Sequence, residues 1–483
     1  MQTIRRLPFA AAAVFVAANL AAQITPGNLV VTRVGDGTTT LSNASTAVFL
    51  DEFTPTGVLV QTIAMPTSAS GGNLPIANSG SATSEGAISQ SVDGNYLITV
   101  GYGSAPGIPS IVGTLATAVP RVVARIGLDG VVDTSTALTD AYSGNNIRSA
   151  ASLDGVLFWT AGTATAPNGP GVRFTTLGSS TSTQISSTLL NTRVVGIADG
   201  QLYCSSASGA FQGVSSVDTG LPTVGGGTIT LLNGFPTSSG PDSYGFFFAD
   251  ATTLYVADAR NTAAGGIQKW TLNAGSWTLA YTLNPAINIG CRGLSGVVGN
   301  GIVTLFATTT NNLLVSVTDN GAGSAFATLG VAPFNTAFRG VQFVRTPSRV
   351  TITGSPCATS FATPGITSSG GAPVLGNANF AFVGDTLGAF QLGIALLQAA
   401  PALPVGINIP GSPSCALIHV FADVLLGGLT DSAGQFPVPL PLPGDPIFTG
   451  ANVSAQFAVL DFSLTGFSLP IGTSPALTIT IGN

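Results

Sequence analysis

Four arginines occupy matching places in a repeated sequence pattern. Arg148 and Arg193 each lie six residues before the aspartate of an Asp-Gly turn, and the corresponding place in later repeats holds Arg292 and Arg339. A guanidinium group binds carboxylates and sulfates through paired hydrogen bonds. If the fold brings these four residues to one confined mouth, they would attract an anion such as a carboxylate or a sulfated sugar.

The regular spacing of the same four residues also supports a structural interpretation, and favours it over ligand binding. Each arginine would then pair with an acid or a carbonyl group of the adjacent repeat and fasten the repeats together. Structural devices recur with a repeat, whereas catalytic groups usually break its symmetry. A ligand-binding ring and a purely structural ring are both open at this point.

Two other residues fall in the equivalent places of the remaining repeats. These are Tyr244 and, within a residue or two, Glu85, one of only two glutamates in the chain. Beside the arginines, Glu85 and Tyr244 would be the weak candidates for a catalytic acid and base. A lone glutamate at the beginning of a strand is more often a paired or solvated group, so binding without catalysis is favoured.

The other side chains with reactive groups do not form a recognisable centre. The single histidine, His419, lies in the alternating segment ALIHVF and is interpreted as a structural residue. One histidine cannot build a His-rich zinc site, and a Ser-His-Asp triad would have to bridge two domains. No loop has the alternating aspartates of a calcium-binding EF-hand. The sequence therefore predicts no metal and no cofactor.

Tryptophans are the remaining groups that could bind a sugar, by stacking on its ring. Trp159 and Trp270 lie in segments expected to be strands, where packing between repeats needs large apolar groups. Trp277 follows Asn-Ala-Gly-Ser and is expected to be the exposed one.

Short strands in a repeat of about fifty residues must position these side chains. Tight-turn dipeptides, which mark pairs of antiparallel strands, recur at Asp93-Gly94, Asp154-Gly155, Asp199-Gly200 and Asn300-Gly301. Four strands per repeat at this spacing are typical of the blades of a β-propeller. The chain is therefore predicted to be an all-β protein.

The two ends of the repeat region complement each other. The N-terminal copy, with NLVVTRV, VFLDEF and VLVQTI, lacks its first strand, and an orphan strand, FRGVQFV, begins at Phe338. Pairing these segments would close a ring and leave no open sheet edge. We therefore predict a six-bladed β-propeller over residues 24–347.

The region after Pro347 has a different character. Proline-rich turns such as PVPLPLPGDP separate apolar runs, which predicts an antiparallel β-sandwich over residues 350–483. Cys357 and Cys415 both fall in this region and are the natural disulfide pair of an oxidising compartment. Cys204 and Cys291 fall in different repeats, and their state is left open.

The N-terminus predicts export. Arg5 and Arg6, an apolar run and small residues before Gln23 are typical of a secretory signal peptide over residues 1–22. No later run is long enough to cross a membrane, so no transmembrane segment is expected after cleavage. With 14 basic and 20 acidic residues, the chain lacks the positive field that nucleic-acid binding requires. A secreted or loosely surface-associated protein is expected.

Several segments resemble an uncharacterised family of secreted bacterial proteins with propeller-like repeats. The resemblance rests on NLVVTRVGDG, VFLDEFTPTG, NNIRSAASLDG, NTRVVGIADGQLY, YGFFFADATTLYVAD, GGIQKW and NTAFRGVQF. The stretch from GSPCATS to LTITIGN resembles a C-terminal module found on many secreted bacterial proteins. These resemblances imply secretion and a β-sandwich for sorting or surface attachment, and they bring no established reaction.

Together these observations favour a secreted, non-catalytic binding or surface-interaction protein. Its partner would be an extracellular glycan, an anionic small molecule or a protein. The alternative is an extracellular hydrolase or lyase that acts on a carbohydrate or polyanionic substrate at the arginine-lined mouth. An enzyme would need an acid or tyrosine that faces the arginines unpaired, whereas a binding protein would not.

Overall fold

A computed structural model describes residues 23–286 and 288–482. Almost all of the regular structure is β-strand, with two short 3-10 turns. The predicted signal peptide, residues 1–22, lies outside the described residues. Over the described range, no helix is long and apolar enough to cross a membrane.

Four antiparallel sheets of four strands each follow one another along the chain. Tight turns join their first two strands; at one of them Asp199 and Gly200 both have positive φ, 47° and 71°. The strands are β9 (Ile147–Ser152), β10 (Leu157–Gly162), β11 (Arg173–Thr176) and β12 (Thr183–Gln184); β13 (Val195–Ala198), β14 (Gln201–Ser208), β15 (Phe211–Val217) and β16 (Ile229–Leu231); β17 (Ser243–Asp250), β18 (Thr253–Asp258), β19 (Gly266–Asn273) and β20 (Ser276–Leu283); β21 (Cys291–Gly299), β22 (Ile302–Thr309), β23 (Leu313–Thr318) and β24 (Phe326–Val331).

The N-terminal strands join the last strand of the repeat region, as predicted. β25 (Ala337–Phe343) pairs with β1 (Leu29–Val34), which continues to β2 (Ser45–Phe53) and β3 (Leu59–Ala64). The short β4 (Ala77–Ser79) pairs with both β2 and β6 and so links this sheet to the next one. That next group contains β5 (Ile88–Gln90), β6 (Tyr96–Tyr102), β7 (Arg121–Gly127) and β8 (Val132–Leu138).

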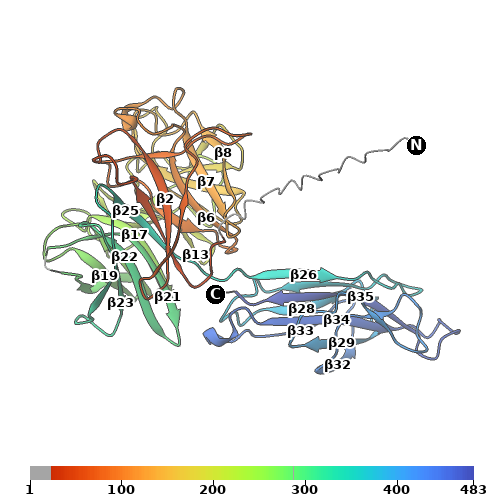
Figure 1. Ribbon diagram of the computed structural model, residues 1–483. Coiled ribbons are helices and arrows are strands. Elements are labelled where there is room, and N and C mark those ends of the chain that lie inside the picture. Colours follow the sequence, from red (N-terminus) through yellow and green to blue (C-terminus); the bar gives the residue numbers. More distant parts are fainter. Residues whose placement is uncertain (1–22, 287, 483) are drawn as a thin grey trace, which may run out of the picture.

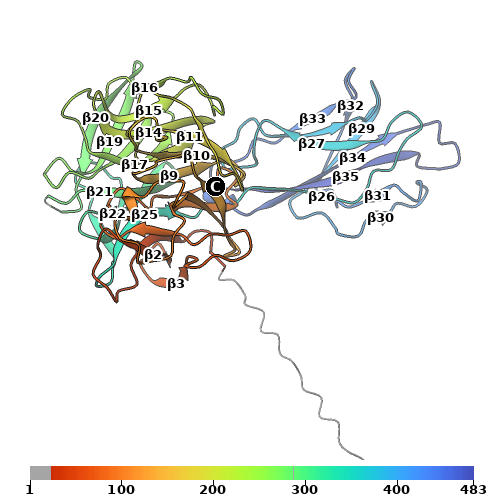
Figure 2. The same cartoon turned by 90° about the horizontal axis from the view of Figure 1, so that it is seen from above.

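The first strands of successive sheets, β5, β9, β13, β17, β21 and β25, contact one another in turn, and β25 returns to β5. Gly86 contacts Gly340 near the beginnings of β5 and β25, and Gln90 contacts Arg345 further along both strands. Neighbouring first strands such as these therefore run in the same direction. Figure 2 shows β9, β17 and β25 nearer the middle of this part and β3, β16 and β20 nearer its rim. The arrangement is consistent with a β-propeller.

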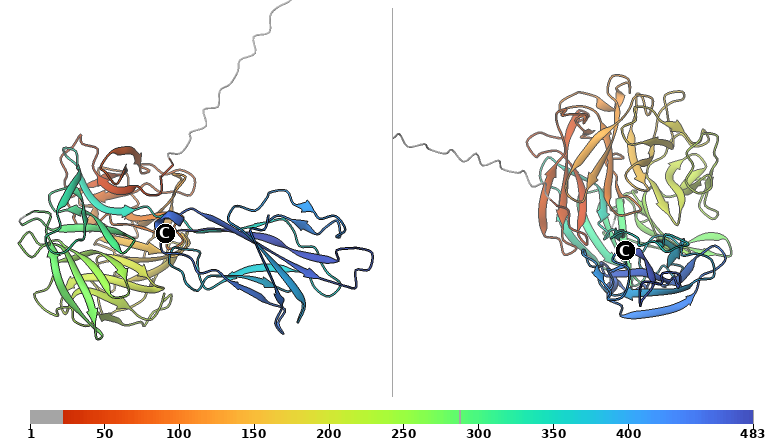
Figure 3. Two further views of the ribbon diagram at one scale, coloured as in Figure 1. Left: turned by 90° about the horizontal axis from the view of Figure 1, so that it is seen from below. Right: turned by 90° about the vertical axis from the view of Figure 1, so that its right-hand side faces the viewer.

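The C-terminal strands form an elongated part beside these sheets (Figures 1 and 3). Its five-stranded sheet has the order β26 (Arg349–Thr353), β35 (Ile471–Thr480), β34 (Asn452–Leu460), β29 (Leu392–Gln398) and β32 (Val424–Leu429). A three-stranded sheet contains β27 (Gly365–Ser369), β28 (Ala381–Asp385) and β33 (Phe436–Pro439), and β30 (Ile407–Asn408) pairs with β31 (Leu417–Ile418). Buried side chains of both larger sheets, among them Phe382 and Phe457, form one core.

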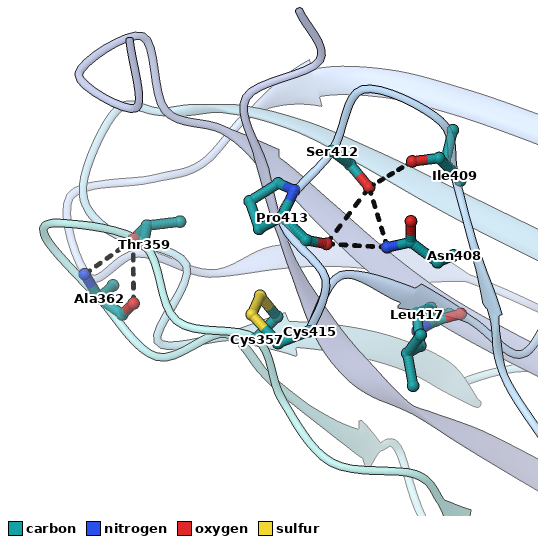
Figure 4. Close-up of a disulfide and its surroundings, with 10 residues drawn as sticks. Cys357, Thr359, Ala362, Asn408, Ile409, Ser412, Pro413, Cys415 and Leu417 are labelled. Atoms are coloured by element: carbon teal, nitrogen blue, oxygen red, sulfur yellow. Dashed lines mark hydrogen bonds between the residues drawn. A yellow bond between two sulfur atoms is a disulfide. The ribbon is translucent and has the colours of Figure 1, made fainter. Parts of the chain in front are cut away.

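The predicted disulfide between Cys357 and Cys415 is present, with the two Cα atoms 5.1 Å apart. It ties the segment after β26 to the loop before β31 (Figure 4). Cys204 and Cys291 are buried free thiols in different sheets. Burial raises the pKa of the Cys204 thiol to about 12, which keeps it protonated.

Two of the three predictions about tryptophan are confirmed and one is wrong. Trp159 and Trp270 are buried in the cores between sheets, as expected. Trp277 is also buried, with only 6% of its surface exposed, and packs against Phe248. The adjacent turn suggested exposure, but the residue belongs to β20, whose neighbours cover it.

Candidate functional site

The structure brings the predicted arginines, Tyr244 and Glu85 to one end of the first strands. Because these strands run in the same direction, residues at matching places near their beginnings must meet. A cavity of about 40 Å³ there is lined by Glu85, Tyr244, Arg292 and Arg339. We call the group of Glu85, Arg148, Arg193, Tyr244, Arg292 and Arg339 the arginine mouth.

Three of the arginines hold the adjacent sheet. Arg148 and Arg193 reach groups at or just before the neighbouring first strand, and Arg339 reaches the residue that follows β4, as the structural interpretation expects. Arg148 Nη1 donates to Asn191 Oδ1 (2.6 Å) and to the Thr192 carbonyl (2.9 Å). Arg193 Nη1 contacts Asp242 Oδ1 (2.5 Å) and the Ser243 carbonyl (3.2 Å). Arg339 Nη2 donates to the Gly80 carbonyl (2.9 Å).

These contacts leave much of the donor capacity of the arginine mouth unused. The Nε atoms of Arg148, Arg292 and Arg339 are buried and have no hydrogen-bond partner among the described residues. The guanidinium of Arg292 makes no hydrogen bond or ion pair anywhere in the described part of the chain; its contact is with the Tyr244 ring, whose centroid lies 5.9 Å from Cζ. The Nε atoms are fully enclosed and a ligand cannot reach them, whereas the guanidinium of Arg292 lines the cavity and its terminal nitrogens are available to a ligand.

The positive charges also lie close enough to oppose one another. The pKa of Arg339 is lowered to about 10: burial is the main cause, the attraction of Glu85 opposes it, and the charge of Arg292 contributes to the lowering. Burial likewise lowers the pKa of Arg148, with a contribution from the charge of Arg193. Within the arginine mouth the only ion pair among the described residues is the one between Arg193 and Asp242. An incoming anion would relieve this repulsion.

Glu85 is fully engaged and does not present a free acid. Its side chain accepts hydrogen bonds from the Ser79 amide (2.9 Å), the Tyr102 hydroxyl (2.5 Å) and Asn146 Nδ2 (2.5 Å). Only 3% of the residue is exposed, and burial raises the pKa of its carboxyl. Tyr102 and Asn146 come from β6 and from the residue before β9; no sequence signal marked either one as a partner of Glu85.

Tyr244 is better placed than Glu85 to touch a ligand. Its ring lies under the guanidinium of Arg193, with Cζ 4.2 Å from the centroid, and near that of Arg292. Its hydroxyl makes no hydrogen bond to any described residue and is accessible from outside. The ring therefore holds two cations in place by cation–π attraction, and the hydroxyl can bind a ligand.

His419 lies far along the chain from the arginine mouth and has a structural contact. It is buried in the C-terminal part, and its Nδ1 lies 2.8 Å from the Leu403 carbonyl oxygen. Within residues 23–286 and 288–482, no group of three or more histidine, cysteine or acidic side chains gathers as a metal site would require.

Comparisons with known proteins give distant structural similarities to β-propeller proteins. The periplasmic gluconolactonase PpgL of Pseudomonas aeruginosa is 12% identical, with a TM-score of 0.35, over 86% of this chain and 100% of that chain. A chain of the nidogen/laminin complex is 12% identical, with a TM-score of 0.39, over 65% and 97%. Apo AztD of Citrobacter koseri is 11% identical, with a TM-score of 0.29, over 94% and 98%. No protein-family model matches the sequence, and no curated protein is similar enough to match.

Proposed function

We propose that this chain is an exported, non-catalytic binding protein that holds an oxyanion group, a carboxylate or a sulfate, in the arginine mouth. The observation that carries the proposal is the guanidinium of Arg292, which lines the cavity and makes no hydrogen bond or ion pair to any described residue. A carboxylate accepts such donors in pairs and supplies the missing negative charge.

The fold that supports this function is, in our proposal, a six-bladed β-propeller over residues 24–347 followed by a β-sandwich over residues 350–483. The six first strands that contact one another in turn support the number of blades. The core shared by the two larger C-terminal sheets supports the sandwich. Residues 1–22 would be removed on export, and N-terminal sequencing of the mature protein should then begin at Gln23.

The size of the cavity limits what can enter. It measures about 40 Å³, and a site for one water needs about 10–15 Å³ by the same kind of measure. This space suits one oxyanion group and excludes a whole sugar ring. The ligand would therefore present a terminal or protruding anionic group, as a uronic acid, a sulfated sugar or a small carboxylate does.

Catalysis by a hydrolase or lyase is the second candidate, and one observation favours it: the hydroxyl of Tyr244 has no partner among the described residues, and the ring of Tyr244 lies near the guanidinium groups of Arg193 and Arg292. The acid that this reaction would need is not free, because three donors already occupy Glu85. Product formation from polyuronates or sulfated glycans that is abolished by Tyr244→Phe would establish catalysis and overturn the non-catalytic proposal.

The binding proposal is tested by calorimetric titration with acetate, sulfate and glucuronate at constant ionic strength. We expect at least one anion to bind, and Arg292→Gln to weaken its binding tenfold or more because one bidentate partner is lost. Arg349→Gln is the matched control, since Arg349 is exposed on β26 in the C-terminal part. Equal binding by the wild type and Arg292→Gln, or no binding of any of the three anions, would show that the arginine mouth is only structural.

A further inference from the structure

A second and larger cavity lies at the opposite ends of the first strands. Its volume is about 540 Å³, within the range of about 300–1,000 Å³ typical of small-molecule sites. All six first strands, or the residues that directly follow them, contribute to its wall, and Ala372, Val374 and Leu375 of the C-terminal part complete it. We call this cavity the chamber. Ile88, Val194 and Leu294 line both cavities, so the chamber lies directly beyond the arginine mouth.

One side of the chamber is aromatic. Phe246, Phe247 and Phe248 are consecutive in β17, line the chamber and are only partly buried. Phe246 and Phe248 pack towards the core beside the β13–β16 sheet and Phe247 towards the core beside the β21–β24 sheet, so only the exposed edges of these rings face the chamber. Glycines on the two neighbouring first strands make room for their rings. A Cβ atom at Gly196 would lie 3.1 Å from Phe246 Cζ, and one at Gly296 would lie 2.6 Å from Phe247 Cδ1. Larger residues at these two places would push the rings away from the wall.

The rest of the wall needs hydrogen-bonding partners. Gln342 Nε2 donates to the Phe343 carbonyl (2.7 Å), which leaves its side-chain oxygen unused among the described residues. The guanidinium of Arg345 reaches the Ser91 carbonyl (3.1 Å) but forms no ion pair in the described part of the chain, and the carboxylate of Asp199 has no partner there. In addition, most of the first strands are edge strands of their sheets, and some of their backbone groups are therefore free of ladder hydrogen bonds.

These features of the chamber wall indicate which kind of molecule it would bind. A purely apolar molecule would leave the polar wall unsatisfied, at a cost of about 1–3 kcal/mol for each buried group. An anion is opposed because two carboxylates, Asp199 and Asp250, line the chamber against one cation, Arg345. A neutral polyhydroxylated molecule satisfies both conditions, since its hydroxyls bind planar amide, carboxylate and guanidinium groups and its C–H faces pack on aromatic rings.

We propose that the chamber binds a neutral saccharide of one or two rings, enclosed jointly by the first strands and the segment 372–375. The site is separate from the arginine mouth and does not depend on anion binding there. It also gives the C-terminal part a role in binding, because Ala372, Val374 and Leu375 close one side of the chamber.

The test is calorimetric titration of the full mature chain with glucose, galactose, mannose, maltose, cellobiose and lactose. Concentrations up to about 10 mM detect even a weak, millimolar Kd. We expect at least one sugar to bind. Gln342→Leu should weaken that binding about tenfold by removing a hydrogen-bonding group. Gln435→Leu is the matched control, because Gln435 is exposed on a turn of the C-terminal part.

A second variant guards against loss of folding. Val92 lines the chamber with 41% of its surface exposed, so the larger side chain of Val92→Trp narrows the chamber without disturbing the core and should weaken sugar binding. Arg292→Gln should bind the sugar as the wild type does, which distinguishes this site from the arginine mouth. The proposal is overturned if none of the six sugars binds, or if binding survives unchanged in both Gln342→Leu and Val92→Trp.

Discussion

Comparing Arg193→Gln with Arg292→Gln should distinguish an arginine that stabilises the fold from one that binds a ligand. Arg193 forms an ion pair with Asp242 (2.5 Å), a hydrogen bond to the Ser243 carbonyl (3.2 Å) and a cation–π contact with Tyr244 (4.2 Å). The side chains of the ion pair are 18% and 36% exposed, so it is worth at most about 1 kcal/mol. The hydrogen bond adds about 1 kcal/mol and the cation–π contact about 0.5–1 kcal/mol. Loss of all three predicts a fall of about 2–3 kcal/mol in the free energy of unfolding.

Arg292 has none of these contacts except the weaker one to the Tyr244 ring at 5.9 Å. Its charge also opposes that of Arg339, so Arg292→Gln removes a repulsion. The expected change in the free energy of unfolding is therefore close to zero. For a large domain about 1 kcal/mol corresponds to roughly 2 °C. Scanning calorimetry without added anion should show a Tm lower by about 4–6 °C for Arg193→Gln and unchanged within about 1 °C for Arg292→Gln.

The same experiment with ligand supplies the second half of the test. An anion at 100 times its Kd stabilises the native state by about 2.7 kcal/mol, or roughly 5 °C. The wild type should show this rise, and Arg292→Gln should lose most of it. If Arg292→Gln instead lowers the Tm without anion as much as Arg193→Gln does, Arg292 is a fastening residue and the reasoning from its unused donors is refuted.

Three further predictions concern stability and reactivity. Burial raises the pKa of Asp319, but hydrogen bonds from Lys269 and two tyrosines outweigh it and lower this pKa to about 2. In the unfolded chain the pKa of an aspartate is about 3.9, so the free energy of unfolding that Asp319 contributes is present above that pH and should be lost as the pH falls through about 2. Asp319→Asn should cost about 2–3 kcal/mol in urea unfolding, since the amide leaves Lys269 without its ion pair, and an unchanged midpoint would contradict this. Removal of the Cys357–Cys415 disulfide, which spans 58 residues, should lower the stability of the C-terminal transition by about 4 kcal/mol in calorimetry, and an unaltered transition would count against it. The buried thiol of Cys204 should react with a thiol reagent only after unfolding, and rapid labelling of the native protein would show that the site opens.

The features predicted well from the sequence depend on local rules. Asp199-Gly200 marks a tight turn because few other pairs tolerate positive φ at both positions, and the structure has φ of 47° and 71° there. The pairing of β25 with β1 follows from a missing first strand at the N-terminal end of the repeat region and an orphan strand at its other end, since an open edge is costly. The convergence of the arginines follows in turn, because matching places on strands that run together must meet.

The features that the sequence did not reveal depend on contacts between distant segments. Glu85 could have been a free acid, but Tyr102 and Asn146 approach it from other strands and engage its carboxylate. Trp277 follows a turn and yet is buried, because Phe248 of β17 packs against it. The residues that line the chamber are spread along the chain from Ile88 to Leu375, and no local pattern records how much space they enclose.

The contrast in charge between the two cavities follows from the repeat itself. Four of the first strands, β5, β9, β13 and β17, lead into a tight turn with aspartate. Aspartate is favoured there because its carboxylate accepts the amides of the turn, as Asp154 Oδ1 does from Val156 (2.8 Å) and Leu157 (2.9 Å). Near the beginnings of four of the strands the repeat places arginine. Since all six strands run together, the arginines gather at one end and the turn aspartates at the other. The repeat therefore places cationic side chains at one end of the first strands and carboxylates at the other. For this reason we expect an anion at the first end and a neutral ligand at the second, and each binding test includes a variant of the other site.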